Sequence, residues 1–119
     1  ASKRLVNKVT SICLEKDIDP KDVELTGHSL GGAVALITGA LMVRDEIIPR
    51  QIVTFGAPKC GRLKILDRVP VSMYRHGRDI VPMVPPLMRR HCKMIEKNKP
   101  GSSYIKDHYM VNYVEMVKD

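Results

Sequence analysis

A serine between two glycines, at the junction of an apolar run and a helix-forming run, constrains the fold more than any other feature of this chain. The residues Gly27-His28-Ser29-Leu30-Gly31 match the pattern G-x-S-x-G. A short apolar strand is predicted over Val23–Thr26 before the pattern, and a helix rich in small residues over Leu30–Arg44 after it. In such a strand–turn–helix the serine occupies a strained turn, and its hydroxyl projects above the sheet.

The neighbours of this serine have expected roles in the turn. Gly27 and Gly31 are expected to be structural parts of the elbow, leaving room where the strand and the helix approach each other. The backbone N–H of Leu30, at the helix N-terminus, is expected to donate to an oxyanion hole. His28 is expected to point away from Ser29, as a packed or hydrogen-bonded structural histidine. The alternative is a chance G-x-S-x-G in an ordinary turn.

An acid and a histidine follow the serine in the order used by hydrolases of this fold. Asp79 comes after a strand predicted over Val71–Tyr74, at the carboxyl edge where loops of a parallel sheet build sites. His108 lies at a predicted loop-to-helix junction. As the base, His108 would take the Ser29 proton while Asp79 holds the other ring N–H. The alternatives are a turn aspartate and a capping or exposed histidine.

Other residues compete for the acid and base roles. His76 precedes Asp79, against the expected order, and His91 lies in a basic run before a predicted strand. The weaker acids by position are Asp45, Asp67, Asp107 and Asp119. Of these, Asp67 is the best substitute for Asp79 because it follows a short predicted helix.

The remaining segments continue an alternation of helices and strands. Further helices are predicted over Ser2–Lys16, over Gly61–Leu66 and from Asp107 or His108 through Val117. Further strands are predicted over Gln51–Phe55 and Cys92–Glu96, and loops over Gly77–Pro86 and Lys97–Ser103. This order predicts one α/β domain over residues 1–119, with a mostly parallel sheet of three to four strands flanked by helices.

Taken together, four ordered segments resemble the class 3 (fungal-type) lipases of the α/β-hydrolase superfamily. The segments are Thr26–Ala33, Val53–Pro58, Gly77–Pro82 and Asp107–Tyr109, with Pro85-Pro86 and Tyr113 beyond them. The resemblance implies a partial α/β-hydrolase fold, the C-terminal portion of the family. It also implies a lipase- or carboxylesterase-like serine hydrolase without metal or cofactor, which cleaves lipid esters through an acyl-enzyme. Ser29, Asp79 and His108 would be its nucleophile, acid and base.

The resemblance also suggests what could complete the fold. In that family much of the sheet precedes the elbow, as does the loop that supplies a second oxyanion donor. We therefore expect the strand beginning at Val23 to pair with a missing N-terminal half or with a second copy of the chain. The alternatives are a catalytically impaired remnant that binds lipid or protein, and an acyltransferase or thioesterase with the same triad.

Charge and cysteine content bear on partners and location. A net charge of +7 with 4% aromatic residues and no Trp argues against nucleic acid as a partner. Attraction to an anionic membrane surface is a better use of this charge, although a merely soluble basic surface is the favoured interpretation. The resemblance implies a lipid or small ester substrate. The sequence has no membrane-spanning stretch and no signal peptide, which slightly favours an intracellular location. Cys13, Cys60 and Cys92 lack metal-ligand spacing and are expected to be free thiols, with one disulfide as the alternative.

Overall fold

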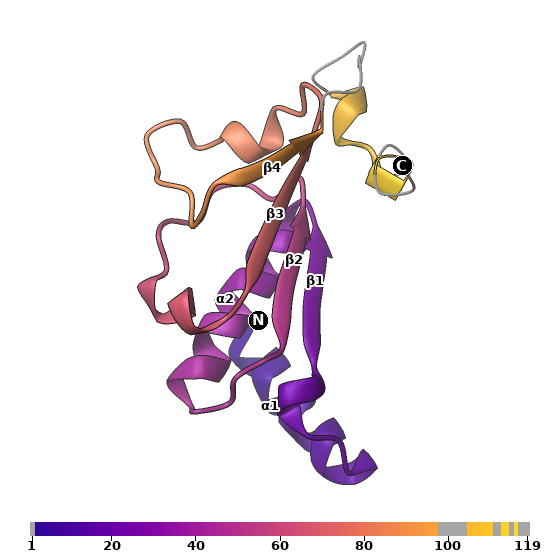
Figure 1. The fold of residues 1–119 in the computed structure, drawn as a ribbon, viewed down its shortest axis with the longest axis vertical. Coiled ribbons are helices and arrows are strands. Elements are labelled where there is room, and N and C mark those ends of the chain that lie inside the picture. Colours follow the sequence, from indigo (N-terminus) through magenta and orange to yellow (C-terminus); the bar gives the residue numbers. More distant parts are fainter. Residues whose placement is uncertain (1, 98–104, 111–112, 115, 117–119) are drawn as a thin grey trace.

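Four parallel strands form the sheet of the computed structural model, in the order β1-β2-β3-β4. The structure describes residues 2–97, 105–110, 113–114 and 116. The strands are β1 (Glu24–His28), β2 (Gln51–Phe55), β3 (Val71–His76) and β4 (Met94–Lys97). Their carboxyl ends lie at one edge of the sheet, close to the C-terminal segment (Figure 1). The predicted α/β class with a parallel sheet is confirmed.

Two long helices accompany the sheet, and both have the predicted bounds. They are α1 (Ser2–Lys16) and α2 (Leu30–Arg44). Helix α2 packs on β1 and β2, and α1 packs on α2. Glycines allow α2 this close approach, since a Cβ on Gly39 would lie 2.4 Å from Ile52 Cδ1. The sheet and α2 therefore form one rigid support for the turn that joins them.

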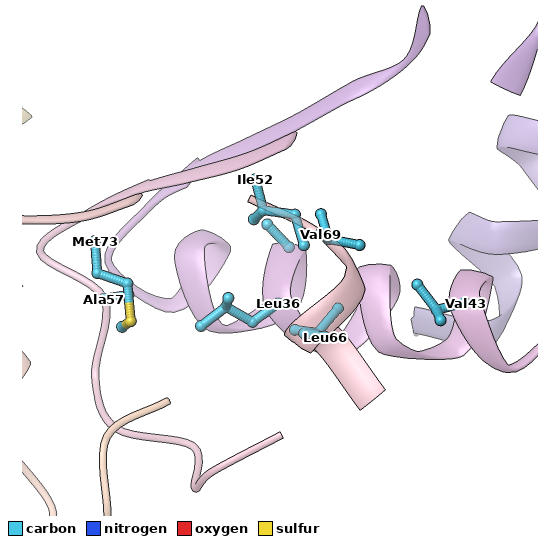
Figure 2. Close-up of a cluster of buried hydrophobic side chains, with 8 residues drawn as sticks. Leu36, Val43, Ile52, Ala57, Leu66, Val69 and Met73 are labelled. Carbon is cyan, nitrogen blue, oxygen red and sulfur yellow. The ribbon is translucent and has the colours of Figure 1, made fainter. Parts of the chain in front are cut away.

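The hydrophobic core lies between α2 and the sheet (Figure 2). Its members come from α2, from β2 and β3, and from the segment between those strands, which includes a 3-10 turn at Lys64–Arg68. They are Ala35, Leu36, Val43, Ile52, Ala57, Leu66, Val69 and Met73. Burying a large aliphatic side chain of this kind contributes about 1.5–3 kcal/mol. The cluster therefore holds the helix whose first turn follows Ser29.

Several strand bounds differ from prediction by a few residues. Strand β1 continues through His28, beyond the predicted end at Thr26, because Gly27 and His28 pair in register with Thr54 and Phe55 of β2. Strand β3 similarly extends to His76, whose Cα partner in β4 is Lys97. Backbone pairing thus overrides the turn-forming tendency of Gly27.

Three further segments also depart from prediction. The short helix expected over Gly61–Leu66 is instead the 3-10 turn at Lys64–Arg68, and the fourth strand begins at Met94 rather than Cys92. The segment predicted as an irregular loop, Gly77–Pro86, contains a 3-10 turn at Val81–Met83.

The last helix begins later than predicted. Lys106–His108 forms a 3-10 turn, and the helical residues that follow it are 110, 113, 114 and 116. The loop predicted over Lys97–Ser103 and the helix end at Val117 lie, apart from Lys97, outside the described residues. His108 thus occupies a short turn before the helix, and its backbone is held by contacts from other segments.

Two further expectations concern the cysteines and membrane insertion. Cys13, Cys60 and Cys92 are all free, so the single-disulfide alternative is not found. Across the described part of the chain, no helix combines the length and apolar character needed to cross a bilayer.

Candidate active site

The turn between β1 and α2 holds Ser29 in an uncommon backbone conformation. Its φ is 58° and its ψ is −130°, a region that costs a non-glycine residue about 1–3 kcal/mol. The Ser29 N–H donates to Phe55 O at 3.0 Å, so the ladder between β1 and β2 continues into the turn. A Cβ on Gly27 would lie 2.1 Å from Gly31 O. Only glycine fits at position 27, as the strand–turn–helix pattern predicts.

The steric prediction for Gly31 is wrong. Across the described residues, a Cβ on Gly31 would meet no atom within 4 Å, because this residue is exposed on the outer side of the helix. The close approach falls on the next residue instead. A Cβ on Gly32 would lie 2.6 Å from the Cβ of Ala57 and 3.2 Å from the Cβ of Thr54. The helix is therefore held near β2 through Gly32.

Three residues that are distant in sequence meet at the carboxyl edge of the sheet. His108 Nε2 lies 2.8 Å from Ser29 Oγ, and His108 Nδ1 lies 2.8 Å from Asp79 Oδ2. Both distances are within hydrogen-bond reach. Asp79 is fully buried, whereas Ser29 and His108 are half-buried. The serine is thus reachable from solvent, and its hydrogen-bond chain ends on a buried carboxylate.

The Asp79 carboxylate is fully engaged. Oδ1 accepts from the Val81 N–H at 2.9 Å, and Oδ2 accepts from the Tyr113 hydroxyl as well as from His108. The Tyr113 oxygen in turn accepts from the His76 N–H at 3.1 Å. Burial and the hydrogen bond to Asp79 raise the pKa of Tyr113, so the phenol remains a protonated donor. These donors fix the orientation of the carboxylate toward His108.

Gly56 is a site residue that sequence reasoning missed. It follows β2 with a φ of 64°, and its N–H donates to Tyr74 O at 2.9 Å. A Cβ there would lie 2.6 Å from Asp79 Oδ2 and 3.0 Å from His108 Nδ1. Its sequence signals are a glycine directly after the strand predicted over Gln51–Phe55 and its place in the family-like segment Val53–Pro58.

His28 has the structural role expected of it. Its Nε2 lies 2.7 Å from the backbone oxygen of His108, and the two rings stack with centroids 4.7 Å apart. A carbonyl oxygen can only accept, so Nε2 of His28 carries the proton and donates. The ring is therefore a donor to the backbone of the segment that carries His108.

His76, a competitor for the base, forms a comparable contact. Its ring is buried, and its Nδ1 lies 3.2 Å from the backbone oxygen of Asp107. By the same argument, Nδ1 of His76 is the donor. The Asp107 carboxylate accepts from the backbone N–H of Arg78 at 2.8 Å. This aspartate therefore holds the backbone of the loop after β3, and its carboxylate is not hydrogen-bonded to His108.

The remaining competitors lie in other pairings. The Leu63 N–H donates to His91 Nδ1 at 3.1 Å, and burial, followed by the nearby Arg62, lowers the pKa of His91. Asp67 pairs with Arg62, and Asp45 pairs with Arg44. Asp119 lies outside the described residues. Within the described ranges, no group of three or more His, Cys, Asp or Glu side chains could hold a metal ion.

Exposed apolar side chains lie close to the site in sequence. Each of the three central residues is followed in sequence by an exposed apolar side chain. These are Leu30 after Ser29, Ile80 after Asp79 and Tyr109 after His108, with exposures of 70%, 43% and 53%. Leu30 is also the first residue of α2, where an N–H has no acceptor within its own helix. An oxygen developing charge beside Ser29 would find that donor available.

Known sequences similar to this chain include several lipases. The family described as Lipase (class 3) matches residues 1–89, a span that contains Ser29 and Asp79. Over 69 residues the chain is 38% identical to secreted mono- and diacylglycerol lipase 1 of Fusarium solani. That alignment covers 54% of this chain but only 20% of the relative. The matched region is thus only a small part of the Fusarium solani lipase.

Solved structures support the same similarity. The triacylglyceride lipase of Rhizomucor miehei superposes with a TM-score of 0.65 and 27% identity, covering 81% of this chain and 40% of that one. A triacylglycerol lipase whose catalytic centre is described as a serine protease triad gives a TM-score of 0.55 and 33% identity. That match covers 71% of this chain and 34% of the other.

Proposed function

Because this chain belongs to the class 3 lipase family, we propose that it is the part of a serine ester hydrolase that carries the nucleophile, the acid and the base. The observation that carries the proposal is the continuous chain of hydrogen bonds from Ser29 Oγ through His108 to Asp79, with 2.8 Å at each step. A hydroxyl, an imidazole and a buried carboxylate in that order are the parts needed to activate a serine.

The proposed chemistry follows from these contacts. His108 Nε2 removes the Ser29 proton as the oxygen attacks an ester carbonyl, and Asp79 stabilises the resulting imidazolium through Nδ1. The Leu30 N–H donates to the oxyanion that forms. His108 then gives the proton to the departing alcohol, leaving an acyl-enzyme on Ser29. Attack by water, again with His108 as the base, releases the acid and restores the serine.

Three exposed apolar side chains, each next to a triad residue in sequence, indicate the class of substrate. Leu30, Ile80 and Tyr109 would desolvate an apolar acyl chain beside the nucleophile, whereas a polar substrate would gain nothing from them. Carboxylic esters of lipids are therefore the proposed substrates, in keeping with the acylglycerol lipases among the similar proteins. The chain's formal charge of +7 would favour an anionic lipid surface as the place of encounter.

A further strand is part of this proposal. Strand β1 lies at the end of the described strand order, so its outer edge has no partner among the described strands. Exposed strand edges favour pairing with another chain. We propose that another segment of the protein or a second copy of the chain covers this edge. Light scattering tests the second option, since a monodisperse monomer would exclude pairing between copies.

Labelling with a fluorophosphonate probe tests the central proposal. The probe reacts with activated serines, so Ser29 of the folded protein should be labelled and the Ser29→Ala variant should not. Asp67→Asn is a matched control because its carboxylate pairs with Arg62 away from the triad, and this variant should label normally. A folded protein that resists labelling would instead support a non-catalytic module that binds lipid or protein.

A further inference from the structure

Two imidazoles other than that of His108 hold the segment that carries this histidine. The backbone oxygens of Asp107 and His108 are consecutive along the chain, and each accepts from a different ring. His76 Nδ1 lies 3.2 Å from the oxygen of Asp107, and His28 Nε2 lies 2.7 Å from the oxygen of His108. Two adjacent carbonyls of one short turn therefore each accept from an imidazole.

The two rings come from the two elements that carry the other members of the triad. His28 is the last residue of β1, immediately before Ser29, and His76 is the last residue of β3, three positions before Asp79. The Asp107 carboxylate adds a contact to the loop after β3 that carries Asp79, because it accepts from the backbone N–H of Arg78 at 2.8 Å. The turn is thus fastened separately to the nucleophile's strand and to the acid's loop.

We propose that His28 and His76 are positioning residues for His108, each setting the place of its backbone through one N–H donor. The inference rests on the proposed function, because it assigns His108 the role of the base. A three-residue 3-10 turn has few hydrogen bonds of its own and cannot hold an imidazole in place unaided. A displacement of about 1 Å at a reacting group can reduce the rate about 100-fold.

Neither ring acts as a second base in this scheme. The nitrogen that each ring directs at the turn is protonated and donates to a carbonyl, which cannot take the proton away. The His28 ring stacks on that of His108 and its donor reaches past it to the backbone. Their contribution should therefore appear in the catalytic rate and leave substrate affinity almost unchanged.

Paired substitutions separate the donor from the rest of the ring. The amide nitrogen of glutamine can occupy the place of a histidine Nε2, and that of asparagine the place of Nδ1. His28→Gln and His76→Asn therefore keep the donor, whereas His28→Leu and His76→Leu remove it. His91→Leu is the matched control, because His91 is also buried but its Nδ1 accepts from Leu63, away from the triad.

The kinetic test is ester hydrolysis by each folded variant. Both leucine variants at positions 28 and 76 should lower kcat at least about tenfold with KM within about twofold, as expected for lost positioning. The Gln and Asn variants should recover most of that loss, and His91→Leu should match the parent. Unchanged kcat in the leucine variants would overturn the inference, as would equal losses in the donor-keeping and donor-lacking variants.

A readout independent of turnover separates this inference from the proposed function. Proton NMR of histidine-labelled protein reports the ring N–H that His108 shares with Asp79. That far-downfield signal should persist in the Gln and Asn variants and disappear in the leucine variants. A protein without turnover that shows this pattern would retain the positioning role and lose the proposed function. A signal unaffected by every substitution would overturn the positioning role.

Discussion

A Cβ atom on Gly56 would lie 2.6 Å from Asp79 Oδ2, inside the space that the carboxylate needs to accept from His108. Gly56→Ala should therefore displace Asp79 or His108 and lower ester hydrolysis about 100-fold or more. Because the φ at position 56 is 64°, the alanine variant should also lose about 1–2 kcal/mol of its free energy of unfolding. Turnover per folded molecule, with folding followed by circular dichroism, measures the first effect.

Gly61→Ala separates the clash from the backbone cost. Gly61 has a φ of 96°, but a Cβ there would meet no described atom within 4 Å. This variant should lose stability by about 1–2 kcal/mol and keep its activity. Equal activity in the Gly56 and Gly61 variants would show that the space beside Asp79 does not matter.

The strain at Ser29 predicts a stability difference between two variants that lack its hydroxyl. Ser29→Gly relieves the positive φ, and Ser29→Ala does not, so the glycine variant should be more stable by about 1 kcal/mol. Urea denaturation of both variants measures this difference. At Ser72 in β3 the order should reverse, with glycine less stable than alanine by about 0.5–1 kcal/mol. If the stability difference between the glycine and alanine variants had the same sign at positions 29 and 72, strain in the turn at Ser29 would be ruled out.

The two glycines that follow Leu30, Gly31 and Gly32, predict opposite responses to alanine. Gly32→Ala places a methyl 2.6 Å from Ala57 Cβ, so α2 must move away from β2, at a cost of about 1–3 kcal/mol. Gly31→Ala meets open space in the described part of the chain and gains helix propensity of up to about 1 kcal/mol. Thermal unfolding of the two variants should give shifts of opposite sign, and a matching loss in both would contradict the assignment.

Tyr113→Phe tests the hydroxyl that links Asp79 to His76. Removing it leaves the His76 N–H without its acceptor and Asp79 without one donor, which should cost about 1–3 kcal/mol near pH 8. The pKa of Tyr113 is raised in the folded state, while an unfolded tyrosine ionises near pH 10. The stability that Tyr113 provides is therefore complete below about pH 10 and declines as the pH rises further.

Urea denaturation of the parent and of the Tyr113→Phe variant at several pH values tests the direction of this pH dependence. The difference in unfolding free energy should narrow above about pH 10, by at most about 1.4 kcal/mol per pH unit. Tyr109→Phe, which removes an exposed hydroxyl, should cost little stability at about pH 8. A gap between parent and Tyr113→Phe that widens with pH would contradict the argument.

Residues that interrupt a helix or strand pattern explain why most elements could be predicted from sequence. Both long helices have their predicted bounds because Asp17 to Pro20 and the turn at Ser29 interrupt the pattern within one or two residues. The predicted start of the last helix is too early, because the sequence alone favours a helix that opens at Asp107 or His108. In the structure their backbone oxygens accept from His76 and His28, contacts that only the folded chain creates.

The site shows the same limit. The order of Ser29, Asp79 and His108 is visible in sequence, and the structure brings these three side chains together. The need for glycine at position 56 is not visible, because it arises from groups 23 and 52 residues further along the chain. The failed prediction for Gly31 has a related cause: a helix turns by about 100° per residue, so Gly32 and not Gly31 faces the sheet.

The backbone ladder of the sheet does not stop at the strand ends. Ser29 N–H still bonds to Phe55 O, and Gly56 N–H to Tyr74 O. The distance between the Ser29 hydroxyl and the Asp79 carboxylate therefore depends on the twist of the sheet. Ile52 of β2 and Met73 of β3 belong to the buried core that packs on this sheet. Laboratory selection for faster turnover should therefore recover substitutions in the interior of the sheet, far from any bound ester.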